Sequence, residues 1–283
     1  VHPGGPPPAP VPPGPIVPSP GPIPGLPQVF VGAGDIAQCT SNAEATARLL
    51  DTIGGTIFTT GDNAYFHGSR ENYRDCYEPT WGRHKGRTRP TPGNHEYESP
   101  GAAAYFDYFG INARPYGLGY YSFDLGSWYA ISLNSNVPTQ RGSTQGMWLS
   151  EILGESSSFR CTVVYWHHPL FSSGPNGDNG SVRDFWRILY EAGVEIVLNG
   201  HDHVYERFAP QDPDGRPDPV RGIRQFTVGT GGASITTFPT QRPNSEVRLA
   251  TYGVPKLTLS ADAYEWEFVP VSGPRDSGRG TCH

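Results

Sequence analysis

The chain has 283 residues, with 21 basic and 27 acidic side chains and a formal net charge of −6. This balance argues against nucleic acid as a main partner, because binding to a phosphate backbone needs a basic face. No apolar run approaches the length of a membrane-spanning helix, so we expect no membrane span. The 36 glycines and 30 prolines exclude a helix bundle and favour many turns.

Residues 1–27 differ in composition from the rest of the chain. Thirteen of these 27 residues are proline and five are glycine, and Asp, Glu, Lys and Arg are absent. Such a segment cannot form a core, so we expect an extended, polyproline-like linker. A ligand for a proline-recognising module is the alternative. Residues 28–283 are predicted to form one globular domain.

From residue 28 onward, strand and helix patterns alternate, and the chain ends in strands. The pattern predicts strands at residues 29–35, 56–60, 162–166, 194–198 and 224–228, a hairpin at 120–134 and two final strands within 256–270. It predicts helices at residues 42–53, 101–109, 144–153 and 182–192. This order favours an α/β fold with two mixed sheets and helices on the outside.

Polar clusters follow the predicted strands or open turns. They are Gly34-Asp35, Gly61-Asp62-Asn63-Ala64-Tyr65, Gly93-Asn94-His95-Glu96, His167-His168-Pro169 and Gly200-His201-Asp202-His203. Each cluster offers Asp, Asn, His or Tyr, which bind hard or borderline cations. Because ligand sites of α/β sheets lie at the carboxyl ends of strands, we expect the clusters to form one metal site.

These motifs, in this order, resemble the calcineurin-like metallophosphoesterases. Tyr65 lies three residues after Asp62, which gives the Gly-Asp-x-x-Tyr pattern of the purple acid phosphatases within that superfamily. The closing stretch around Trp266 is similar to secreted bacterial members. The resemblance covers residue 29 to the end of the chain, and it implies a four-layer α/β/β/α sandwich with the catalytic domain at residues 28–283.

The resemblance also implies a set of metal ligands. Asp62 would bridge two metal ions, and the other ligands divide into Asp35, Tyr65 and His203 for the first ion and Asn94, His167 and His201 for the second. A phenolate such as Tyr65 favours a trivalent ion, which in the family is Fe(III), and the second ion would be Fe(II), Zn or Mn. His168 is the alternative to His167 as a ligand.

Further residues are implied in catalysis and substrate binding. His95 would contact phosphate and protonate the leaving group, with Asp62 and Asn94 also in the reaction centre; alternatively, it only orients Asp62 or Asn94. Glu96 and Asp202 are expected to orient ligands or to lie at the surface. The stretch 171–180 lacks the histidines of plant members, so His67, Arg70 and His168 could contact substrate in their place. A solvated surface position for Arg70 is equally open.

The function implied is a phosphomonoesterase that works by in-line attack of a metal-bound hydroxide, with inorganic phosphate as a product. A phosphodiesterase or nucleotidase using the same metals is the alternative, and an inactive metal-binding surface protein is a third reading. A secreted or cell-surface location is expected.

The four cysteines are Cys39, Cys76, Cys161 and Cys282. An even number fits two disulfides, although four buried thiols stay open as an alternative. We expect Cys39–Cys76 near the rim of the metal site, because these residues follow the first and second motifs. The pair Cys161–Cys282 would then tie the C-terminal segment to a core strand.

Overall fold

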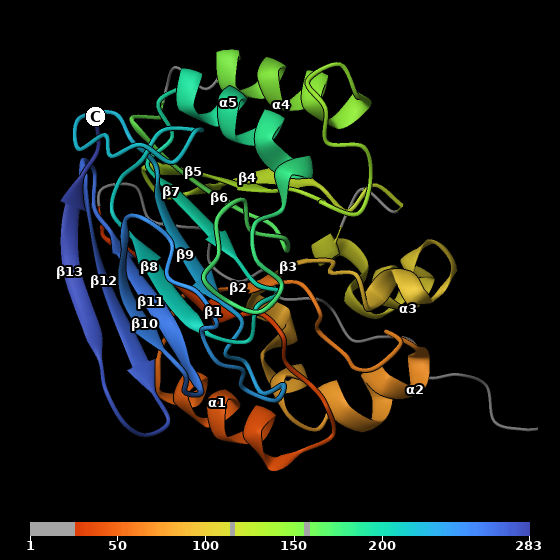
Figure 1. Ribbon diagram of the computed structural model, residues 1–283. Coiled ribbons are helices and arrows are strands. Elements are labelled where there is room, and N and C mark those ends of the chain that lie inside the picture. Colours follow the sequence, from red (N-terminus) through yellow and green to blue (C-terminus); the bar gives the residue numbers. More distant parts are fainter. Residues whose placement is uncertain (1–25, 114–116, 156–158) are drawn as a thin grey trace, which may run out of the picture.

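The computed structural model describes residues 26–113, 117–155 and 159–283. Within these residues, two β-sheets pack face to face and helices cover their outer faces (Figure 1). The expected four-layer α/β/β/α sandwich is confirmed. Apart from Leu26 and Pro27, the Pro-rich segment lies outside the described residues, so its predicted boundary stays a prediction.

The first sheet begins with parallel strands that lead into the first polar turns. These strands are β1 (Gln28–Ala33), β2 (Thr56–Thr60) and β3 (Thr88–Thr91), paired in that order. Antiparallel strands extend the sheet beyond β1, namely β11 (Gly253–Leu259), β12 (Ala263–Pro270) and β13 (Asp276–Thr281). The carboxyl ends of β1, β2 and β3 therefore lie at one edge.

The second sheet also has a parallel centre. It is formed by β5 (Trp128–Ser132), β6 (Cys161–Tyr165), β7 (Ile196–Asn199) and β9 (Arg224–Val228). The antiparallel strands β4 (Tyr121–Leu125), β8 (Tyr205–Phe208) and β10 (Ser245–Leu249) complete it. The turns after β6 and β7 carry the later polar motifs.

Helices and short turns of 3-10 and π type complete the layers. Helices α1 (Ser41–Thr52) and α3 (Ala103–Phe109) pack on the first sheet, and α4 (Thr144–Glu155) and α5 (Arg183–Glu191) pack on the second. The turn of α2 (Arg70–Asn72) leads into a π-helix, Tyr73–Tyr77, and then a 3-10 helix, Trp81–Arg87. Further 3-10 turns are Glu96–Glu98, Pro100–Ala102, Gly110–Ala113 and Gly180–Val182.

The core explains why β1 is a continuous apolar run. Phe30 points between the two sheets, where its ring lies 4.8 Å from that of Phe58 and 5.6 Å from that of Tyr165. Val31 points the other way, into the layer under α1. A strand buried on both faces needs apolar residues at successive positions instead of an alternating pattern.

The main helices and nine of the strands, namely β1, β2, β4 to β7, β9, β11 and β12, were predicted correctly, with small errors at their ends. The helix expected over residues 101–109 begins only at Ala103, because Gly101 has a φ of 62° and interrupts it. The strand expected over residues 194–198 begins at Ile196.

Strands β3, β8, β10 and β13 were not predicted. Strand β3 contains Pro90, which is compatible with its edge position. In β13, Gly278 and Gly280 pair with Trp266 and Tyr264, and a Cβ at Gly278 would lie 2.2 Å from the Trp266 ring. These glycines give room to the aromatic rings, although in the sequence they suggest a loop.

Both expected disulfides, Cys39–Cys76 and Cys161–Cys282, are present, so the alternative of four free thiols is wrong. The second one ties the C-terminal segment to β6. Among the described residues, none of the helices has the length and apolar character needed to cross a bilayer.

Candidate metal centre

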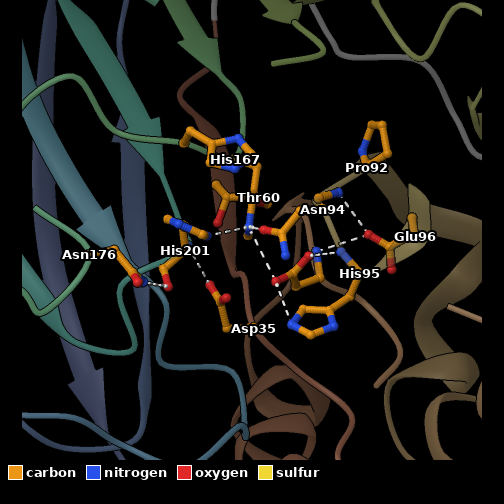
Figure 2. Close-up of polar contacts among 12 residues, drawn as sticks. Asp35, Thr60, Pro92, Asn94, His95, Glu96, His167, Asn176 and His201 are labelled. Carbon is orange, nitrogen blue, oxygen red and sulfur yellow. Dashed lines mark hydrogen bonds and ion pairs between the residues drawn. The ribbon is translucent and has the colours of Figure 1, made fainter. Parts of the chain in front are cut away.

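The predicted ligand residues lie in the turns after β1, β2, β3, β6 and β7. The carboxyl ends of these parallel strands bring the turns together between the two sheets (Figure 2). Asp35, Asp62 and His201 have left-handed backbones, with φ values of 59°, 51° and 70°. A non-glycine residue in this region costs of order 1 kcal/mol or more, and such strain clusters at functional sites.

Backbone hydrogen bonds hold the first two turns side by side. Asp35 N–H donates to the Gly61 carbonyl over 3.0 Å, and Ile36 N–H donates to the Asp62 carbonyl over 2.9 Å. The third turn comes so close that a Cβ at Gly93 would lie 2.1 Å from Asp62 Oδ1. Glycine at this position is therefore a condition for the approach of the β2 and β3 turns.

Asp35, Tyr65 and His203 form the first group of donors. The Tyr65 hydroxyl lies 3.0 Å from Asp35 Oδ1 and 3.1 Å from His203 Nε2. His203 Nε2 lies 3.3 Å from Asp35 Oδ1. Ligand atoms about 2.1 Å from one cation, at right angles, would be about 3 Å apart. The three atoms therefore have the spacing of neighbouring ligands.

Asn94, His167 and His201 form the second group. His167 Nε2 lies 3.0 Å from Asn94 Oδ1 and 3.2 Å from His201 Nδ1 (Figure 2). Asp62 stands between the two groups, since its Oδ2 atom is 3.2 Å from the Tyr65 hydroxyl and 3.2 Å from His167 Nε2. The structure thus brings together all seven side chains that the sequence analysis singled out as ligands.

The tautomers of two histidines follow from their backbone partners. His167 Nδ1 donates to the Thr60 carbonyl over 2.7 Å, and His203 Nδ1 donates to the Ser234 carbonyl over 2.8 Å. A carbonyl can only accept, so each Nδ1 carries a proton, and each ring, when neutral, presents its Nε2 lone pair to a carboxylate. Lone pairs that face one another need a proton or a metal cation between them.

The pKa shifts of the side chains in the two groups also indicate that positive charge is stabilised there. Burial opposes the charged form of His167, but the adjacent Asp62 carboxylate outweighs it and raises the pKa of His167 to about 9. Burial is likewise outweighed at His203 by the Asp35 carboxylate, which raises its pKa to about 9. Burial, with the charges of Asp35 and Asp62, raises the pKa of the Tyr65 phenol well above its ordinary value. In the protein alone, protons provide the charge that a cation would supply.

His95 lies beside the two donor groups. Its backbone N–H donates to Asp62 Oδ1 over 2.9 Å, and its Nδ1 donates to the Phe66 carbonyl over 2.5 Å. Its Nε2 is 3.8 Å from Asp62 Oδ2. A quarter of the side chain is exposed, so the ring can meet a bound ester at the edge of the site.

The remaining predicted substrate contacts differ in position. His168 lies near the second group, with its ring 4.4 Å from that of His201 and its Nδ1 2.8 Å from Ser135 Oγ. His67 and Arg70 are exposed outside the donor groups. His67 pairs with Glu98 and Arg70 pairs with Asp107, both at 2.5 Å.

Glu96 has a larger role than its position in the motif suggested. It is fully buried, and Oε2 accepts from the backbone N–H groups of Asp62 (2.9 Å) and Gly93 (2.7 Å). Oε1 accepts from the N–H groups of Asn63 (2.8 Å) and Ala64 (3.3 Å) and from the Tyr73 hydroxyl (3.1 Å). One carboxylate therefore joins the turns that carry Asp62 and Asn94.

Asp202 is also buried, and its carboxylate is hydrogen-bonded to the stretch 171–180. It accepts from the Ser172 hydroxyl and, over 2.9 Å, from the Asn176 N–H. Asn176 Nδ2 in turn donates to the His201 carbonyl over 3.1 Å (Figure 2). The stretch 171–180, which lacks histidine, thus supports the turn of His201 and His203. Of the two predicted options for Glu96 and Asp202, the structure favours orientation over a surface position.

A two-sheet α/β/β/α sandwich with these donors between its sheets defines a metallophosphoesterase fold. The family model described as calcineurin-like phosphoesterase matches residues 27–205, and the chain belongs to this family. Purple acid phosphatase 21 of Arabidopsis thaliana is 30% identical over 262 residues, which cover 83% of this chain and 57% of that protein. The predicted likeness to purple acid phosphatases is thus confirmed, and the chain spans little more than half of this relative.

Solved structures agree on the fold. Purple acid phosphatase PPD1 from yellow lupin (Lupinus luteus) superimposes with a TM-score of 0.79 at 19% identity, covering 92% of this chain and 55% of that one. GAP50, described as the anchor in the inner membrane complex of Plasmodium, superimposes with a TM-score of 0.70 at 14% identity. The superposition covers 91% of this chain and 90% of GAP50. At these sequence identities the structural similarity establishes the fold, and the chemistry must be argued from the side chains of the site.

Proposed function

We propose that this chain is a binuclear metal-dependent phosphomonoesterase similar to the purple acid phosphatases. The observation that carries the proposal is the position of Asp62 Oδ2, which is 3.2 Å from a donor atom of each group. A carboxylate shared by two sets of donors fits a pair of cations. Two metal ions hold the attacking and leaving oxygens of a phosphoryl transfer and lower the pKa of bound water.

The assignment of ligands follows the two groups. Asp35, Tyr65 and His203 would hold one ion, Asn94, His167 and His201 would hold the other, and Asp62 would contact both. His167 is preferred to His168 because its Nε2 is the atom that faces Asp62 and Asn94. We infer Fe(III) at the Tyr65 group, because a phenolate is a hard anionic donor, and Fe(II), Zn or Mn at the other.

The side chains beside these groups would bind and protonate the substrate. Asn94 and His95 would contact a phosphate held at the two groups. Because Nδ1 of His95 is engaged by the Phe66 carbonyl, its Nε2 is the atom that can give a proton to the leaving oxygen. His168, whose ring lies beside that of His201, would contact the substrate near the second donor group. His67 and Arg70 would contact the substrate outside the donor groups if it displaced Glu98 and Asp107.

Metal analysis combined with a visible spectrum tests the proposal. Two metals per chain, with a broad visible band that Tyr65→Phe abolishes or strongly alters, would support Fe(III) at the Tyr65 group. An unchanged spectrum in that variant would contradict this role of Tyr65. Two metals without iron or colour would keep the binuclear site and refute the choice of iron.

Hydrolysis assays then separate the activities that one metal pair can perform. An aryl phosphate monoester, the matching diester and a nucleoside monophosphate are compared on the metal-loaded protein. The proposal predicts the highest kcat/KM for the monoester. Faster diester or nucleotide hydrolysis would favour a phosphodiesterase or nucleotidase. Two bound metals without hydrolysis of any ester would favour a non-catalytic binding protein.

The location of the protein is inferred from its disulfides. Cys39–Cys76 and Cys161–Cys282 fit an oxidising compartment, so we propose a secreted or cell-surface protein. Non-reducing mass mapping of protein isolated from its native source tests this inference, since free thiols at all four positions would contradict it.

A further inference from the structure

The ring of His203 is held by a backbone carbonyl in a segment that contains neither helix nor strand. Its Nδ1 atom donates to the Ser234 carbonyl over 2.8 Å, and its Nε2 atom lies 3.1 Å from the Tyr65 hydroxyl. Ser234 belongs to residues 229–244, which connect β9 to β10 and are all described. Because a ligand histidine is oriented by the partner of its other ring nitrogen, the position of Ser234 decides where Nε2 points.

The side chain of Gln38 holds Ser234 in place. Gln38 Oε1 accepts from both the backbone N–H and the hydroxyl group of Ser234, each over 3.1 Å. The neighbouring bond from Ala233 N–H to the Asp35 carbonyl, over 2.8 Å, fixes this segment only as far as residue 233. The two hydrogen bonds of Gln38 therefore fix the next residue, whose carbonyl accepts from His203.

The backbone of Gln38 is in turn fixed on both sides. On one side, Ala37 forms a β-bridge with Ala64. On the other side, Cys39 has a left-handed backbone with a φ of 57° and is joined to Cys76 by the disulfide. Residues with a side chain favour negative φ, so Cys39 without the cross-link would relax and shift the side chain of Gln38.

A shift of the Ser234 carbonyl would change only the first donor group. Nε2 of His203 lies 3.3 Å from Asp35 Oδ1, and a ring whose Nδ1 loses its acceptor can turn Nε2 away. In the second group, His167 is held separately, because its Nδ1 donates to the Thr60 carbonyl over 2.7 Å. Loss of the contact to Ser234 should therefore weaken one ion and spare the other.

We propose that Gln38 is a positioning residue that orients His203 through Ser234, and that the Cys39–Cys76 disulfide keeps Gln38 in this position. The inference rests on the proposed binuclear site and adds the residues that tune one of its two ions. A metal ion at the first donor group would thus depend on a glutamine and a disulfide that do not themselves bind it.

Gln38→Leu tests the contact, because leucine has a similar volume but offers no acceptor. In the metal-free protein, NMR should show that the Ser234 amide proton and the Nδ1 proton of His203 exchange about tenfold faster in this variant than in wild type. Gln38→Glu keeps acceptor oxygens and should exchange as wild type does. Gln241→Ala is the matched control, because Gln241 is an exposed glutamine in the same segment, and it should change neither proton.

Calorimetric titration with Zn²⁺ measures the effect on metal binding. Gln38→Leu should weaken one of the two binding steps about tenfold and leave the other within about twofold, since groups that support a ligand change metal affinity by about 10–100-fold. Removal of the disulfide by Cys39→Ala with Cys76→Ala should give the same loss. Because the disulfide acts through Gln38, adding Gln38→Leu to this pair should cause no further loss.

Three outcomes would overturn the proposal. They are equal weakening of both binding steps by Gln38→Leu, additive losses from the glutamine and the disulfide, and a faster Ser234 amide proton beside an unchanged His203 ring proton. If wild type binds no Zn²⁺, the proposed function fails, and proton exchange in the metal-free protein still decides the role of Gln38.

Discussion

Substitution of Glu96 by glutamine tests how the turns of the candidate site are held in place. Two N–H donors face Oε2 of Glu96, and three donors face Oε1. A carboxamide keeps one acceptor oxygen and places an NH₂ group at the other position. The less costly orientation puts the NH₂ group at Oε2, against the N–H groups of Asp62 and Gly93.

The expected magnitude follows from these two lost bonds. A buried donor without an acceptor costs about 1–3 kcal/mol, so Glu96→Gln should cost about 2–6 kcal/mol in total. If the turns stay in place, the cost lowers the free energy of unfolding. If the turns move apart to find other acceptors, Asp62 and Asn94 separate, and metal affinity falls by about tenfold for each 1.4 kcal/mol.

Both quantities are therefore measured, by urea unfolding of the metal-free protein and by calorimetric titration with metal. Glu195→Gln is the matched control, because Glu195 is also buried but precedes β7 at the opposite end of the strand from His201. Its Oε2 accepts from Thr162 N–H, whereas its Oε1 accepts no hydrogen bond and lies 3.9 Å from His283 Nδ1, so a carboxamide keeps the bond to Thr162. If Glu96→Gln changed neither stability nor metal affinity by more than about 0.5 kcal/mol, the reasoning would be refuted.

Three further predictions follow from other buried groups. Burial raises the pKa of Glu195 to about 7, so stability should fall by about 3 kcal/mol as pH rises from about 4.5 to 7, and urea unfolding of Glu195→Gln should lack this slope. Replacing Cys161 and Cys282 together by serine should cost about 5 kcal/mol, because the bond closes a separation of 121 residues; an unchanged urea midpoint would contradict this. Gly93→Ala places a Cβ 2.1 Å from Asp62 Oδ1 and should reduce the metal content after dialysis by at least half, while full retention would show that the turns can yield.

Most metal-ligand candidates could be found from the sequence because they follow recognisable strands, whereas Asn94 follows the unpredicted strand β3 and was found from the order of the motifs. Runs such as Thr56–Thr60 end directly in the turn that carries Asp62, so the order of motifs indicated which turns would meet. The disulfide Cys39–Cys76 could be placed for the same reason, since Cys39 follows the first of these turns, and Cys161–Cys282 was then the second pair. Local sequence patterns were therefore sufficient to locate a ligand where its motif directly follows a predicted strand.

The contacts that support the site could not be derived in this way. Glu96 receives hydrogen bonds from two separate turns, and nothing in its local sequence tells a buried carboxylate from an exposed one. His67 and Arg70 were predicted as possible substrate contacts, with a surface position open for Arg70. Their ion pairs depend on how the segment 67–70 packs against the 3-10 turn of Glu98 and against α3, which carries Asp107. Long-range packing of this kind leaves no periodic signal in the sequence.

The most direct test of the account is a crystal structure of the metal-loaded protein with anomalous difference density. We expect two peaks, one among Asp35, Tyr65 and His203 and one among Asn94, His167 and His201, with Asp62 contacting both. A single peak, or a second peak coordinated by His168 in place of His167, would contradict the proposed binuclear site.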